Sequence, residues 1–179
     1  MPSKKPDNLV DFFQNSPLVG VELDLARDSS PVCEGMQTTM SEDDMPITYS
    51  HDPAAVDWSR LKDDLTADDF DNGRTPDELR RSFENSAVVV FAWYNGRVIG
   101  KARALSDGVC NAYVVDVWTH SDYRRRGIAT QMMTLLADRL PGQHIYLFTD
   151  DAEKFYHSLG YRRQGVGMSI VSGQWLNRF

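Results

Sequence analysis

The spacing of hydrophobic positions changes along this chain, and the first clear pattern is that of β-strands. Residues 87–94 and 97–105 are rich in valine, alanine and aromatic residues, and Asn95-Gly96 between them is typical of a two-residue hairpin turn. Residues 111–119 follow the next turn as a third, mostly apolar segment. These three segments predict an antiparallel meander.

Before the meander, apolar residues recur at helical spacing. A first amphipathic helix is expected over residues 57–65. A second is expected to begin at Pro76, because Thr75 and Glu78 form a capping box around a proline at the first helical position. Both helices are expected to bury one face.

After the meander, helices and strands alternate. Residues 128–140 and 151–159 predict helices, residues 144–149 a short strand, and residues 161–171 a final strand region. A strand that returns after a crossover helix lies parallel to its neighbour. The expected fold class is therefore α/β with a mixed sheet: an antiparallel meander, then a parallel step, with helices on both faces.

The N-terminal part differs in texture from the rest. Residues 1–44 hold several prolines, are mostly polar and acidic, and predict a flexible arm, whereas residues 45–179 predict one globular domain. The formal net charge of −7 argues against a nucleic-acid binder. No apolar run approaches the length needed to span a membrane, and a cytoplasmic location is expected.

Cysteines and histidines add little chemistry. Cys33 and Cys110 are far apart and lie in no metal-binding or redox motif, so they are expected to be ordinary thiols. The histidines are scattered, and no metal is expected.

The third strand leads into the most informative segment of the chain. Arg124, Arg125 and Arg126 supply positive charge, and Gly127 allows backbone amides to approach an anion. The helix that follows adds partial positive charge at its N-terminus. A solvated basic patch is the alternative, but the strand-turn-helix context favours a phosphate-binding turn.

This segment resembles the GNAT superfamily of acetyl-CoA-dependent N-acetyltransferases. The motif R/Q-x-x-G-x-G/A is matched by residues 124–129, and A-x-x-x-Y-x-x-x-G-F/Y by residues 152–161, which include Tyr156. The resemblance spans about residues 47–175. The sequence departs from the family at Ser121, where proline is common, and at Thr149, where asparagine is frequent.

The resemblance implies the GNAT fold and acetyl-CoA as co-substrate, without a metal. Amides of the turn would hold the pyrophosphate, and the strand before it would bind the pantetheine arm through its backbone. The residues assigned to acetyl-CoA are Val117, Trp118, Thr119, Arg124, Arg125, Arg126, Gly127, Ile128, Ala129 and Thr130.

The resemblance also implies direct attack of a primary amine on the thioester, through a tetrahedral intermediate. Tyr156 would protonate the leaving thiolate, although a tyrosine packed in the core is the alternative. Asp116 is the first candidate for the general base, and an ion pair with Arg103 is an equally weighted alternative. Asp69 and Asp71 are the other candidates for the base.

The acceptor is expected to be a small-molecule or protein amine. Asp69, Phe70 and Asp71 form an acidic loop that would attract a cationic acceptor. Dimers are common among similar proteins, so a homodimer is also implied. A member that kept the fold and lost catalysis is a further alternative.

A second hypothesis concerns the arm. Residues 8–28 resemble the C-terminal, toxin-binding tail of Phd/YefM-type antitoxins. This resemblance implies a GNAT-like binding or regulatory module whose arm captures a protein partner. The alternative is a leader that packs on its own domain.

Overall fold

The computed structural model describes residues 46–165 and 167–172 of the 179-residue chain. All of them belong to one compact unit, Met40–Phe179. The predicted domain boundary at residues 44–45 and the antitoxin-like segment, residues 8–28, lie outside the described residues. Among the described residues, no helix is both long enough and apolar enough to cross a membrane.

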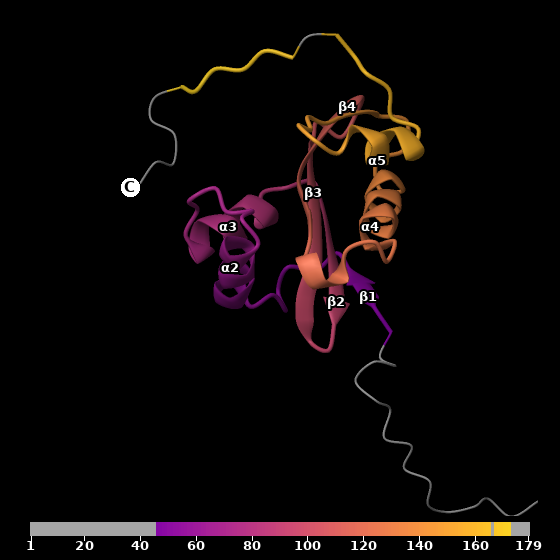
Figure 1. The fold of residues 1–179 in the computed structure, drawn as a ribbon. Coiled ribbons are helices and arrows are strands. Elements are labelled where there is room, and N and C mark those ends of the chain that lie inside the picture. The colour runs from indigo at the N-terminus through magenta and orange to yellow at the C-terminus, as the bar shows by residue number, and fades with distance from the viewer. Residues whose placement is uncertain (1–45, 166, 173–179) are drawn as a thin grey trace, which may run out of the picture. The chain divides into compact units, whose positions relative to one another are not determined.

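A five-stranded mixed sheet forms the centre of the fold (Figure 1). Its strands follow the order of the chain: β1 (Thr48–Ser50), β2 (Val88–Tyr94), β3 (Arg97–Ser106), β4 (Asn111–Thr119) and β5 (His144–Tyr146). The first four strands pair antiparallel, and β4 pairs parallel with β5. The predicted meander and parallel step are confirmed.

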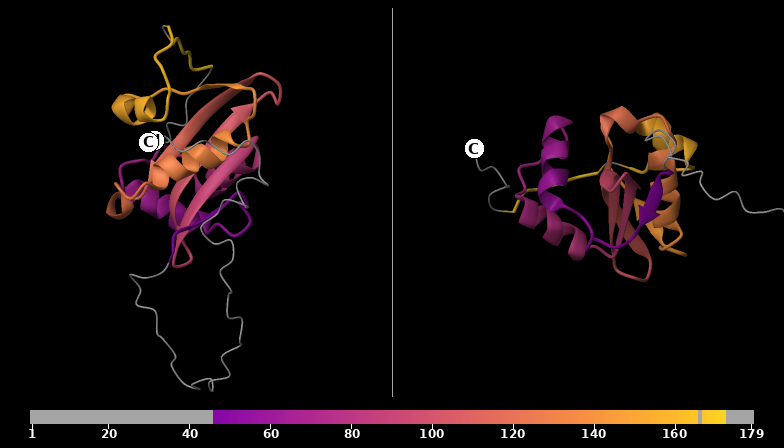
Figure 2. Two further views of the ribbon diagram at one scale, coloured as in Figure 1. Left: turned by 90° about the vertical axis from the view of Figure 1, so that its right-hand side faces the viewer. Right: turned by 90° about the horizontal axis from the view of Figure 1, so that it is seen from below.

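Helices cover both faces of this sheet, as Figure 2 shows from below. The helices α2 (Trp58–Ala67) and α3 (Pro76–Glu84) lie on one face, and α4 (Ile128–Ala137) lies on the other. The shorter α5 (Glu153–Ser158) follows β5 on the α4 side. Each face therefore has its own apolar core.

The helix starts follow the local sequence. The side chain of Asp57 accepts a hydrogen bond from Arg60 N at the start of α2. At the start of α3, Thr75 and Glu78 form the predicted capping box. Side chains that satisfy these orphan amides fix where the two helices begin.

Close packing holds α4 against the sheet. A Cβ on Gly100 of β3 would lie 3.0 Å from Met132 Cε and 3.2 Å from Ile128 Cγ2. Both helix residues are buried in the core on this face. The missing side chain at residue 100 thus lets the start of α4 approach the sheet.

The sequence-based prediction of a final strand over residues 161–171 is wrong. Residues 161–165 and 167–172 contain no strand. Arg163 forms a bidentate ion pair with Glu153 of α5, at 2.6 and 2.8 Å, and Gly165 and Gly167 add backbone freedom that disfavours a strand. This contact joins Arg163 to α5.

Smaller differences concern the ends of elements. The strand predicted over residues 144–149 stops at Tyr146, and the helix predicted over residues 128–140 stops at Ala137. The edge strand β1 and the short 3₁₀ helix η2 (Ser121–Tyr123) were not predicted. Three-residue elements carry too few positions to show a period.

Candidate active site

The arginine-rich turn has the backbone geometry of an anion-binding loop. Gly127 is the N-cap of α4 and adopts the left-handed conformation, with φ 76° and ψ 1°. Arg125 is also left-handed, with φ 65°. A Cβ on Gly127 would meet no protein atom within 4 Å, so the backbone angle, and not a neighbouring residue, calls for glycine here.

The N-terminus of α4 is open to a ligand. No side chain caps it, and the helical hydrogen bonds begin with Gln131 N donating to Gly127 O at 3.0 Å. The amides of Ile128, Ala129 and Thr130 therefore have no carbonyl partner within the helix. Together with the helix dipole, these amides suit a phosphate group.

The three arginine side chains lie in different directions. Arg124 donates to Thr119 O at 3.0 Å and to Asp68 Oδ2 at 2.7 Å, which ties it to the strand and to the loop after α2. Arg126 stacks over the Tyr123 ring, 5.3 Å from its centroid, beside a surface hollow of about 410 Å³. Arg125 is exposed. Positive charge from Arg125 and Arg126 therefore stays accessible near the helix start.

The strands β4 and β5 stay paired over a short distance only. Asn111, Ala112 and Tyr113 face His144, Ile145 and Tyr146, and β5 ends there. From Val114 to Thr119, β4 therefore has no β5 partner. A free strand edge of this kind offers backbone hydrogen bonds to an extended ligand.

The residues assigned to this edge have different environments. Val117 packs against the core on the α4 face, whereas Trp118 is buried on the opposite face and donates from Nε1 to Asp68 Oδ2 at 2.8 Å. The Thr119 carbonyl already accepts from Arg124. The predicted backbone contact at residue 119 is thus partly occupied within the protein.

A β-bulge interrupts β4 at Asp116. In the pairing with β3, Arg103 faces Val115 and Lys101 faces Trp118, so two residues of β4 oppose one of β3. Asp116 takes a left-handed φ of 57°, which is strained for a residue with a Cβ. The bulge turns the Asp116 side chain toward α2 and α3.

Three cationic side chains surround the Asp116 carboxylate. Arg74 donates to it with both terminal nitrogens, at 2.8 and 3.0 Å, and Arg103 Nε donates at 2.5 Å. Lys101 Nζ lies 3.9 Å away. The ion pair between Asp116 and Arg103, which was the alternative to a general-base role, is present and belongs to a larger network.

This network changes what Asp116 can do. Burial alone would raise the pKa of Asp116, but the charges of Lys101, Arg74 and Arg103 outweigh it and hold the pKa well below its usual range. A carboxylate that keeps its charge so strongly is a weak proton acceptor. The geometry therefore favours an electrostatic role for Asp116.

Lys101, which sequence reasoning missed, is fully buried. Its Nζ lies 5.2 Å from the ring centroids of Phe70 and Phe83, and it donates to Asp116 O at 3.4 Å. Burial lowers the pKa of Lys101 to about 7. The signal in the sequence was the alternation Lys101-Ala102-Arg103, which places two cations on one face of a strand.

The lowered pKa of Lys101 predicts how stability depends on pH. The folded protein releases this proton near pH 7, but the unfolded chain keeps it to about pH 10.5. Between these values the unfolded state binds more protons, so the free energy of unfolding should rise with pH. Urea denaturation at about pH 7 and about pH 9 should show this rise in the wild type and a smaller one in Lys101→Met. Equal rises in both proteins would contradict the prediction.

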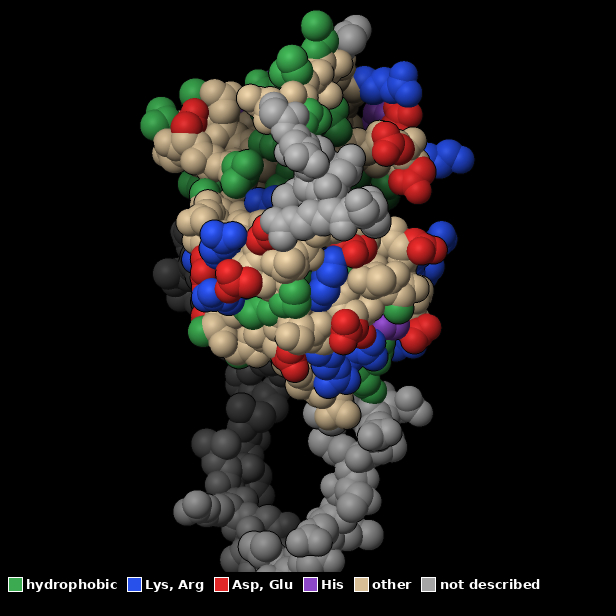
Figure 3. Space-filling view, turned by 90° about the vertical axis from the view of Figure 1, so that its left-hand side faces the viewer, with side chains coloured by type: hydrophobic (Ala, Val, Ile, Leu, Met, Phe, Trp, Pro, Cys, Tyr) green, Lys and Arg blue, Asp and Glu red, His purple; other side chains and the backbone are tan. Residues whose placement is uncertain are grey.

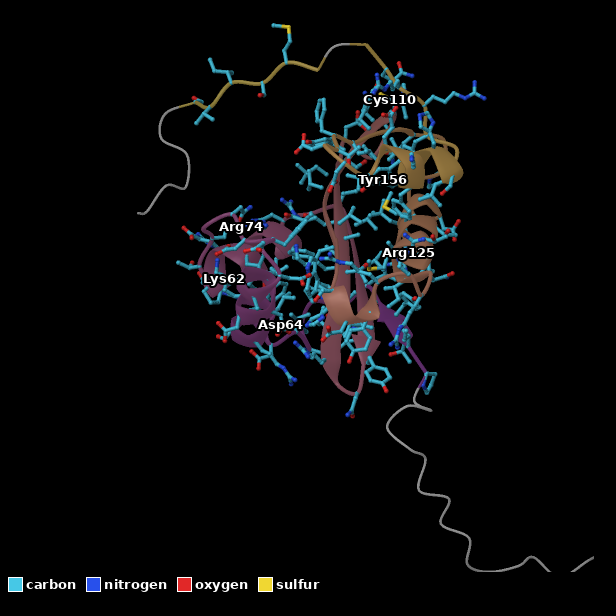
Figure 4. All side chains as sticks on the ribbon, in the orientation of Figure 1. Lys62, Asp64, Arg74, Cys110, Arg125 and Tyr156 are labelled. Atoms are coloured by element: carbon cyan, nitrogen blue, oxygen red, sulfur yellow. The ribbon has the colours of Figure 1, made fainter. Side chains whose placement is uncertain are left out.

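Tyr156 lies on α5, half-buried, on the α4 side of the sheet (Figure 4). Its ring packs edge-on against Phe155 and Tyr161, with centroids 4.9 and 5.8 Å away. Burial raises the pKa of Tyr156, and the neighbouring charges of Tyr161 and Asp151 raise it further. The phenol is thus protonated near neutral pH and able to donate.

The predicted acidic loop is largely neutralised by neighbouring cations. Asp71 forms an ion pair with Lys62 and accepts from Gly73 N at 3.0 Å. Phe70 is 40% exposed and places its ring over Lys101. Asp69 is exposed, with φ 54°, and forms no ion pair with another described residue. Asp69 is therefore the exposed carboxylate of this loop without an ion-pair partner among the described residues.

Metal-binding side chains do not cluster in the described part of the chain. Within residues 46–165 and 167–172, no three His, Cys, Asp or Glu side chains gather closely enough to hold a metal ion. Cys110 is an exposed free thiol, and Cys33 lies outside the described residues.

Comparison with known families identifies the class of protein. The acetyltransferase (GNAT) family matches residues 56–161, which take in the sheet from β2 to β5, the arginine turn and Tyr156. This match covers more than half of the chain. The chain therefore belongs to the GNAT acetyltransferase family.

Solved structures show the same fold. A protein from Xanthomonas campestris pv. campestris assigned to the GNAT family is 24% identical, with a TM-score of 0.62 over 71% of this chain and 95% of its own. A predicted acetyltransferase from Clostridium acetobutylicum, solved with acetyl-CoA, is 21% identical, with a TM-score of 0.55 over 70% and 96%.

An enzyme of stated substrate is also similar. Glucosamine-6-phosphate N-acetyltransferase from Arabidopsis thaliana is 16% identical, with a TM-score of 0.55 over 70% of this chain and 98% of its own. At these identities the likeness concerns the fold alone. The search of curated proteins gave no match.

Proposed function

We propose that this protein is an N-acetyltransferase that transfers the acetyl group of acetyl-CoA to a primary amine by direct attack through a tetrahedral intermediate. The observation that carries the proposal is the uncapped N-terminus of α4, opened by the left-handed Gly127 and placed directly after an unpaired edge of β4. Membership of the GNAT family supports acetyl transfer in general.

The residues present fit acetyl-CoA. The amides of Ile128, Ala129 and Thr130 would bind the pyrophosphate, because no side chain in the described part of the chain caps them and the space above Gly127 is open. The unpaired edge of β4 near Val117 would bind the pantetheine arm. Acetyl-CoA supplies an activated thioester, so the chain needs no nucleophile of its own.

Tyr156 would donate a proton to the leaving thiolate. It lies on the same side of the sheet as Arg125 of the turn (Figure 4), and its raised pKa keeps the phenol protonated. A donor at the sulfur stabilises negative charge as the C–S bond breaks. This role needs the hydroxyl group and not only the ring.

The amine must lose a proton before or during attack. Asp116 is held as an anion by Arg74 and Arg103, and Asp71 is paired with Lys62. Asp69 is the remaining candidate for the general base, because it is exposed. It would accept this proton through water. We assign Asp116 to the electrostatics of the acceptor side instead.

Thermal denaturation tests the assignment of the co-substrate. Acetyl-CoA and CoA at about 100 times their Kd should each stabilise the folded protein by about 2.7 kcal/mol, which raises Tm by several degrees. Adenosine at the same concentration is the control for non-specific binding. If neither acetyl-CoA nor CoA changed Tm, the assignment of acetyl-CoA as co-substrate would be wrong.

A further inference from the structure

The charges around Asp116 do not balance. In the described part of the chain, the ion pairs of Arg74, Lys101 and Arg103 converge on this one carboxylate. The Lys101 side chain is fully buried, and those of Arg74, Arg103 and Asp116 are 9, 15 and 12% exposed. Arg74 and Arg103 thus share one anion in a poorly hydrated place, and Lys101 adds a third positive charge only below about pH 7.

Other nearby acidic side chains are committed elsewhere. Asp68 accepts from Trp118 and Arg124, and Asp71 pairs with Lys62. Figure 3 shows acidic and basic groups interspersed over this face of the domain. The surplus of positive charge therefore persists beneath a mixed surface, and an uncompensated buried cation weakens the fold.

Part of this positive charge is accessible. Arg103 donates from Nε to Asp116 and from Nη1 to Ser82 O and Ser86 Oγ, whereas Nη2 has no partner among the described residues. The Arg103 side chain as a whole is 15% exposed. The two N–H groups of Nη2 can receive a ligand.

The position of the cluster relates it to the acceptor. Asp116 lies at the bulge directly before Val117, whose strand edge is unpaired. Tyr156 and Arg125 lie on the α4 side of the sheet, whereas Arg74 lies on the α2–α3 side (Figure 4). A thioester bound from the α4 side leaves the side of Arg74 and Arg103 to the second substrate.

We propose that the acceptor amine carries a carboxylate, which binds to Arg74 and Arg103. Guanidinium groups recognise carboxylates through paired hydrogen bonds, and burial strengthens them. The acceptor is then an amino acid, or a similar compound with an amine and a carboxylate. This inference rests on the proposed function. It also explains why the fold keeps a destabilising cluster of cations.

The reaction leaves the carboxylate unchanged. The amine nitrogen attacks the thioester carbonyl, the C–N bond forms, the C–S bond breaks, and the CoA thiol leaves with one proton. Before the attack, the ammonium form of the acceptor has lost its other proton to water or to Asp69. The carboxylate serves only to hold the acceptor beside Val117.

Matched pairs of acceptors test the proposal. The protein amino acids, β-alanine and γ-aminobutyrate are each compared with their own carboxamide, by release of CoA thiol. At least one amino acid should show a kcat/KM about tenfold or more above its carboxamide, chiefly through a lower KM. Equal values across all pairs would overturn the proposal.

Variants locate the binding site. Arg103→Met should lower the preference for the carboxylate about tenfold or more, with a small effect on the matched carboxamide. Arg81→Met removes the same charge from the exposed face of α3 and should keep the preference. Asp116→Asn removes the competing anion and should tighten carboxylate binding. A preference unchanged in all the cluster variants would overturn the assignment.

A binding measurement separates this inference from the proposed function. With the CoA-bound protein, an accepted amino acid should raise Tm, its carboxamide should not, and Arg103→Met should abolish the shift. Carboxylate-dependent shifts without any thiol release would refute the proposed activity but support the anion site. Two results would refute the anion site but not the proposed activity. One is thiol release without a preference for the carboxylate, and the other is an equal Tm shift with the amino acid and its carboxamide.

Discussion

Replacing Tyr156 with phenylalanine should lower kcat by about tenfold or more and leave the Kd for acetyl-CoA unchanged. The substitution removes the phenolic proton but keeps the ring, which packs between Phe155 and Tyr161. General acids commonly contribute about 100-fold or more to rate, so a tenfold loss is a conservative threshold. Steady-state thiol release gives kcat, and titration calorimetry gives the Kd.

The neighbouring phenol provides the control. Tyr161 is also half-buried, and burial also raises its pKa, so Tyr161→Phe removes a similar hydroxyl from the same apolar cluster. It should keep most of the activity. If Tyr156→Phe turned over as fast as the wild type, or if both variants lost activity equally, Tyr156 would not be the general acid.

Replacing Gly127 with alanine should weaken acetyl-CoA binding by about tenfold or more, which corresponds to about 1.4 kcal/mol. A Cβ at this position has open space in the protein itself, so the substitution interferes mainly with the ligand above the turn. The φ of 76° adds a backbone cost of about 1 kcal/mol to the free energy of unfolding. Calorimetric titration with acetyl-CoA and urea denaturation measure the two effects separately.

Gly142 allows the backbone cost to be subtracted. It has φ 75°, lies after the C-terminal end of α4, and a Cβ there would meet no protein atom within 4 Å. Gly142→Ala should therefore lower stability to a similar extent and leave acetyl-CoA affinity unchanged. Equal affinity losses in both variants would mean that strain, and not the blocked turn, weakens binding.

Most of the secondary structure could be predicted from local patterns, because the residues that set a turn or a helix start are neighbours in the chain. The Asn95-Gly96 turn set the β2–β3 hairpin, and the Thr75–Glu78 capping box set the start of α3. The prediction of a final strand was wrong because apolar content alone does not determine the structure of residues 161–171. The contact of Arg163 with Glu153 joins residues that no local period links.

The cofactor end of the site was also within reach of sequence reasoning. Residues 124–129 are contiguous, and the phosphate-binding role proposed for them depends on backbone geometry that arginine, glycine and a helix start imply together. The acceptor end was different. Asp116 was nominated as a base, but its partners Arg74 and Lys101 come from the loop before α3 and from β3.

By itself, the sequence determined the order of strands and helices, the arginine turn at the start of a helix and the resemblance to GNAT enzymes, because each depends on neighbouring residues. The tertiary structure decided the environment of Asp116. A bulge in β4 turns its carboxylate toward three cations, two of them on an adjacent strand and one 42 positions away. Such a network exists only when the sheet and the α2–α3 loop pack together, since burial and distance, not residue type, set its electrostatics.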